Sequence, residues 1–74
     1  MNVDIRSREL AEAEAKLGPI PNGCAIRQPD GSWVACDASR APIAGLQPFT
    51  GPDAMPRAGN AANTFVQAGW WRLA

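Results

Sequence analysis

The strongest constraint on the fold is a turn at Pro29-Asp30-Gly31, which joins two short runs of strand-forming residues. Proline presets φ for a turn, and aspartate can bond to its own backbone. Glycine accepts the left-handed conformation that closes a three-residue hairpin loop. Segment 24–37 is therefore predicted to form a β-hairpin.

Folding the chain at this turn fixes which residues face each other. The resulting pairs, counted from the turn, are Gln28 with Ser32, Arg27 with Trp33, Ile26 with Val34, Ala25 with Ala35, and Cys24 with Cys36. One face then carries both cysteines with Ile26 and Val34, while the other brings Arg27 beside Trp33 for a cation–π contact. A lone hairpin is marginally stable in water, so we expect a helix or a third strand to cover its apolar face.

The N-terminal segment 1–18 is predicted to be helical over residues 2–17, because alanine, glutamate, leucine, lysine and arginine dominate it and Gly18-Pro19 follows. Its narrow apolar stripe consists of Val3, Leu10, Ala13 and Leu17. The stripe either covers the hairpin or docks on another subunit or groove.

Segment 38–63 is predicted to be a long irregular arm, because prolines and glycines alternate along it and its apolar residues have no period. We expect four of these residues to occupy pockets on a partner: Ile43, Leu46, Phe49 and Met55. Two other interpretations are a loop that wraps this chain's own core and a flexible linker.

Segment 64–74 is predicted to be a strand, because threonine, phenylalanine, valine and tryptophan favour that structure. One face would carry Phe65, Gln67, Gly69, Trp71 and Leu73, and the other Val66, Ala68 and Trp70. The alternative is a short helix that begins at Asn60 or Asn63 and ends at Gly69, followed by a short strand. Trp70, Trp71 and Arg72 are residue types enriched at binding hot spots, although the tryptophans could instead clamp the hairpin and helix.

The reactive side chains predict no catalytic, cofactor or metal site. The chain has no histidine, so the usual general base and the commonest metal ligand are missing. Two cysteines alone do not supply the four ligands of a structural zinc site. Cys24 and Cys36 are expected to be reduced thiols packed as small hydrophobic side chains, with a disulfide across the hairpin as the alternative.

The charge balance and the length of the apolar runs limit the classes of partner that we expect. Seven basic and seven acidic residues balance within 74 residues, so no basic surface for nucleic acid is predicted. No apolar run approaches the roughly 20 residues of a membrane span, and no signal peptide precedes the helix, so we expect a cytoplasmic protein at synthesis.

Together these features predict one small α+β domain over residues 1–74: a helix, a hairpin, an irregular arm and a tryptophan-rich strand. We expect a non-catalytic structural or accessory subunit that binds a larger protein assembly in many copies, with no nucleic-acid, membrane or small-molecule partner. A bacteriophage virion component of the capsid cement, tail or connector type is the example that this architecture suggests. The alternative is a small soluble inhibitor or adaptor of one enzyme or complex, and a thiol-based redox or metal module comes third.

Overall fold

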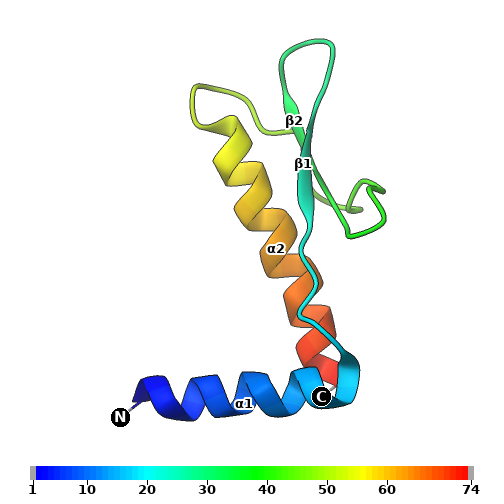
Figure 1. Ribbon diagram of the computed structural model, residues 1–74. Coiled ribbons are helices and arrows are strands. Elements are labelled where there is room, and N and C mark those ends of the chain that lie inside the picture. The colour runs from blue at the N-terminus through cyan, green and yellow to red at the C-terminus, as the bar shows by residue number, and fades with distance from the viewer. Residues whose placement is uncertain (1, 74) are drawn as a thin grey trace.

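The computed structural model describes the backbone of residues 2–73 and the side chains of residues 7–73. Four elements follow one another along the chain: α1 (Asn2–Leu17), β1 (Cys24–Arg27), β2 (Trp33–Cys36) and α2 (Ala54–Leu73). The hairpin lies beside the first half of α2, and α1 crosses the far end of α2, so that the chain has the outline of an L (Figure 1). The predicted α+β class is confirmed.

The hairpin has the predicted register. Cys24 pairs with Cys36, and the ladder continues to Arg27 opposite Trp33. Gly31 has a φ of 90°, and its N–H donates to the carbonyl oxygen of Gln28 at 2.9 Å. The Oδ1 atom of Asp30 accepts hydrogen bonds from the backbone N–H and the hydroxyl of Ser32, at 2.9 and 2.7 Å. The turn residues thus act as their chemistry predicts.

Residues 38–53 form an irregular third edge of the sheet rather than an extended arm. Trp33 and Phe49 exchange two backbone hydrogen bonds, at 2.9 and 2.8 Å, and the N–H of Ile43 donates to the carbonyl oxygen of Ala35 at 3.0 Å. Pro42 and Pro48 interrupt this edge because proline has no N–H to donate to a ladder. The segment therefore wraps the protein's own core, as one of the alternative interpretations stated.

The predictions of an irregular arm up to residue 63 and of a strand over 64–74 are wrong, since residues 54–63 and 64–73 belong to α2. Ala74 lies outside the described residues. Pro56 is tolerated because it lies in the first turn, where backbone N–H groups have no partner within the helix. Ala54, Ala58 and Ala62 are buried at four-residue spacing, which is the period of a helix that packs on one side. Three of the four buried residues of α2 are alanines, and the fourth is Trp70 near the C-terminal end. Phe65, Val66 and Trp71, which also favour a strand, are exposed or half-buried.

The core lies between α2 and the sheet. Ala35, Ile43 and Ala62 form its buried cluster, and Phe49 packs against them. Because residues alternate between the two faces of a strand, α2 covers the face of Ala35 and not the predicted apolar face with the cysteines. Small side chains on both elements let the helix approach the sheet closely. A cation–π contact joins α2 to this same face, with the guanidinium carbon of Arg57 5.5 Å from the ring centroid of Phe49. The predicted cation–π contact between Arg27 and Trp33 is not seen among the described side chains.

Helix α1 packs against the C-terminal end of α2. Its central residue Ala13 is buried, whereas Leu10 and Leu17 are half-buried. In the described part of the chain α1 contacts α2 and not the hairpin, so the expectation that its stripe covers the hairpin is wrong. The side chain of Val3, the first residue of that stripe, lies outside the described residues. The helix ends at Leu17 as predicted. The backbone N–H of the next residue, Gly18, donates to the carbonyl oxygen of Glu14 at 2.8 Å, and Gly18 has a φ of 87°.

Candidate partner-binding site

The seven residues predicted to bind a partner lie in different environments. Ile43 and Trp70 are buried, with 5% and 8% of their surfaces exposed, and Phe49 packs against the core. Met55 is 54% exposed and Leu46 39% exposed. Arg72 is exposed as well, and Trp71 is partly exposed.

The structure does not gather these residues into one site. Met55 and Arg72 lie at opposite ends of α2, separated by about 25 Å at the rise of an α-helix. Leu46 belongs to the irregular edge of the sheet. Trp71, in contrast, lines a hollow between the two helices.

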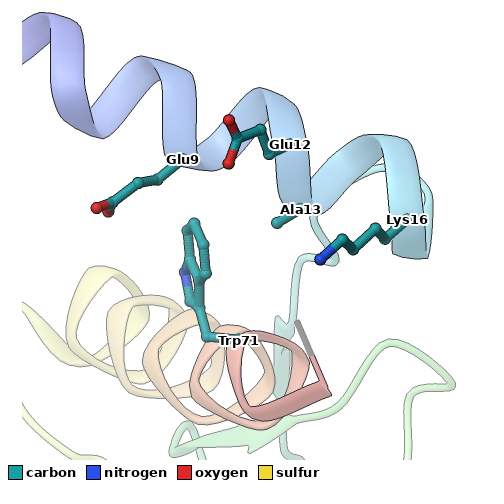
Figure 2. Close-up of a pocket in the computed structure, with 5 residues that line it drawn as sticks. All are labelled: Glu9, Glu12, Ala13, Lys16 and Trp71. Atoms are coloured by element: carbon teal, nitrogen blue, oxygen red, sulfur yellow. The ribbon is translucent and has the colours of Figure 1, made fainter.

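This corner hollow has a volume of about 270 Å³ and is lined by Glu9, Glu12, Ala13, Lys16 and Trp71. The indole ring of Trp71 rises from α2 toward α1, with Glu9 on one side of it and Lys16 on the other (Figure 2). Counted from Glu9, the other three residues of α1 follow after three, four and seven positions, which places them on one face of that helix. Of the five, only Trp71 was among the residues predicted to bind a partner, although Ala13 belongs to the predicted apolar stripe of α1. The three charged residues matter only once α2 lies against α1.

The corner hollow combines two carboxylates with an aromatic ring. Such a combination suits a cationic side chain, which can bond to the carboxylates and lie over the ring. Lys16 supplies one positive charge of its own, so the lining has a net charge of one negative unit. The hollow is thus suited to polar recognition at the rim of a protein contact.

The exposed side of the second half of α2 has a different chemistry. We call it the open face of α2, and it consists of Thr64, Phe65, Ala68, Gly69, Arg72 and Leu73, all of which are exposed. Phe65 and Leu73 have 56% and 74% of their surfaces exposed. The hydroxyl of Thr64 donates to the carbonyl oxygen of Asn60 at 2.8 Å, so it is already satisfied within the helix. Arg72 is the one charged residue of this face.

The two tryptophans point in different directions around α2. Adjacent residues of a helix lie about 100° apart, and not on opposite faces as a strand would place them. Their ring centroids are 5.0 Å apart with an interplanar angle of 76°, an edge-to-face arrangement. The Nε1 atom of Trp70 is buried and has no hydrogen-bond acceptor among the described residues.

Cys24 and Cys36 face each other across the hairpin as reduced thiols. Burial raises the pKa of the Cys36 thiol, and the nearby Cys24 raises it further. A raised pKa keeps this thiol protonated at neutral pH, which lowers its reactivity because the thiolate is the nucleophile. This arrangement agrees with the expectation of packed, reduced thiols. Among the described residues, no group of three histidine, cysteine, aspartate or glutamate side chains could hold a metal ion.

Comparisons of the chain with protein families, curated proteins and solved structures find no match. No helix within residues 2–73 has the length and apolar character needed to cross a membrane.

Proposed function

We propose that this protein is a small, non-catalytic accessory subunit that docks on a larger protein assembly. The observation that carries the proposal is its extended shape. The Cα radius of gyration is 14.3 Å, whereas a compact chain of this length would have about 11 Å. The principal extents are 43, 25 and 17 Å.

The accessible surface supports the same conclusion. The chain exposes 5396 Å², whereas a compact monomer of 7.8 kDa exposes about 4,400 Å² by the scaling of surface with mass. The excess of about 1,000 Å² is close to the roughly 800 Å² that each partner contributes to a specific interface of standard size. The protein therefore exposes enough additional surface for one such contact.

Helix α1 accounts for much of this shape. It has 16 residues and extends away from the sheet, with only its last half close to α2 (Figure 1). Most of the stability of a helix in a protein comes from packing of one of its faces against other elements. Docking of α1 and the corner hollow on a partner would supply that packing, with the carboxylates of Glu9 and Glu12 receiving positive charge from the partner.

The test is the native mass and stoichiometry of the chain in the cells that produce it. Tagged protein should be recovered in a particle far heavier than a 7.8 kDa chain or its dimer, and native mass spectrometry should then count the copies. Many symmetric copies would fit a structural component such as that of a virion, whereas one copy per enzyme would favour an inhibitor or adaptor. Recovery of the chain without another protein would contradict the proposal.

A pair of variants should show whether the corner hollow takes part. Glu9→Gln and Glu12→Gln, made together, remove both carboxylates from the hollow without changing its size. Glu14→Gln is the matched control, because Glu14 is exposed on α1 but does not line the hollow. The double variant should reduce recovery in the particle, and the control should not.

A further inference from the structure

The open face of α2 lacks the charge that an exposed helix face normally carries. No charged residue occurs between Arg57 and Arg72, over a stretch that includes most of this face. Helix α1 of the same chain shows the ordinary pattern, since its exposed residues include Arg8, Glu9, Glu12, Glu14 and Lys16. Charged and polar residues are expected on a helix face that contacts water. The difference between the two helices indicates that the open face is covered by protein.

The open face also continues the stripe by which α2 packs on the sheet. Ala58 and Ala62 are fully buried against the sheet, and Phe65, Gly69 and Leu73 follow at spacings of three, four and four residues. Such spacings keep residues on one side of a helix. The hairpin therefore covers the first half of the stripe and leaves the second half to another molecule.

We propose that a second copy of this chain covers the open face, with the two α2 helices antiparallel across a two-fold axis near Gly69. The spacing is symmetric about this glycine, because Phe65 lies four residues before it and Leu73 four residues after it. Each is about 6 Å along the helix from the centre. A two-fold axis then packs Phe65 of each copy against Leu73 of the other, as a self-complementary interface requires.

The small residues at the centre permit a close approach of the two helices. A Cβ atom added at Gly69 would meet nothing within 4 Å in the monomer, so this point of the surface is open. Ala68 beside it is also small and exposed. The central part of the face carries no charge that would repel a second copy. The two large side chains of the face, Phe65 and Leu73, are 56% and 74% exposed in the monomer, so a second copy would remove substantial apolar surface from water.

Sedimentation of the full-length, reduced chain over a concentration series tests the dimer. We expect a reversible change from 7.8 kDa to twice that mass. Gly69→Leu should weaken the dimer at least about tenfold because the new side chain fills the crossing point. The same substitution should leave the thermal midpoint of the dilute monomer unchanged or raised, because leucine favours a helix over glycine. A variant that simply misfolded would lower both the affinity of the dimer and the thermal midpoint of the monomer.

Two further variants complete the test. Phe65→Glu should also weaken the dimer about tenfold or more, because it places a charge against the second copy. Ala15→Leu on α1 is the control, since it adds the same side chain as Gly69→Leu at an exposed site outside the open face, and it should leave the dimer unchanged. A chain that stays monomeric up to about 1 mM would overturn the proposal. So would a dimer that both Gly69→Leu and Phe65→Glu leave intact, or an open series of larger oligomers. These outcomes concern the isolated chain, so they do not decide whether it joins a larger assembly.

Discussion

Replacement of Gly23 with alanine tests how closely the chain approaches α2 just before β1. A Cβ atom at position 23 would lie 2.6 Å from the Cβ of Ala62 and 2.8 Å from both the backbone carbon of Ala62 and the carbonyl oxygen of Cys36. These neighbours are backbone atoms or a methyl group attached directly to the backbone. None can rotate away, so α2 or the hairpin must move.

The cost of that movement can be worked out from the structure. Overpacking of a tight site costs about 1–3 kcal/mol. The N–H of Gly23 also donates to Oδ1 of Asn63 at 2.8 Å, and loss of this hydrogen bond would cost about 1 kcal/mol more. Against this, alanine restricts the unfolded chain and returns about 0.4–1 kcal/mol. We expect a net destabilisation of about 2–3 kcal/mol, a large share of the total for a chain of this length, which is about 4–11 kcal/mol.

Urea unfolding followed by tryptophan fluorescence measures this loss. With an m value of about 1 kcal/mol/M, the midpoint should fall by about 2–3 M. Gly59→Ala is the matched control, because Gly59 lies inside α2 and a Cβ there meets nothing within 4 Å. That substitution should stabilise the protein by about 0.5–1 kcal/mol. Equal midpoints for Gly23→Ala and the wild type would refute the close approach of Gly23 to Ala62.

Three more predictions concern other parts of the fold. Gly31→Val should destabilise the hairpin by about 1–3 kcal/mol in urea, because valine resists a φ of 90°, and an unchanged midpoint would mean that the turn is wrong. Trp70→Ala should cost about 3–5 kcal/mol. Trp70→Phe should cost clearly less, because phenylalanine keeps an aromatic ring at this buried site while it removes the Nε1 atom that has no acceptor among the described residues. Hydrogen bonds from the hydroxyls of Ser32 and Ser39 lower the pKa values of Asp30 and Asp37 below the ordinary 3.8. The stabilisation that these two ionised carboxylates give the folded protein is complete above pH 3.8 and is lost as the pH falls through their lowered pKa values. The thermal midpoint of the protein should therefore drop in acid, and it should drop less steeply for the Asp30→Asn variant.

The hairpin could be predicted because its determinants are local. Pro29, Asp30 and Gly31 specify the loop, and the loop length then fixes every pair up to the two cysteines. The alternation of side chains along the two strands also assigned these residues to the correct faces of the hairpin. Hydrophobicity alone did not show which face α2 covers, because that depends on the fit of a helix whose buried residues beside the hairpin are alanines.

The second helix was predicted only as a shorter alternative that ended at Gly69, because its local signals favour other structures. Pro56, Gly59 and Gly69 interrupt the helical pattern, and the residues between Asn63 and Arg72 include several strand formers. Its stability comes from packing, since Ala54, Ala58 and Ala62 are almost completely buried against the sheet. This is a tertiary effect, and helix propensity is a weak guide where such packing exists.

The open face of α2 was nevertheless contained in the sequence, although the predicted structure there was wrong. A strand places residues of even spacing on one face, and a helix places residues four apart close to one another. Phe65, Gly69 and Leu73 are separated by four residues, so they share a face in either structure. Trp71, two residues from Gly69, shares that face only in a strand, and the helix turns it toward α1 and the corner hollow. Formation of α2 thus divides the predicted tryptophan-rich site into two surfaces, a polar hollow at the corner and an apolar face for the second copy.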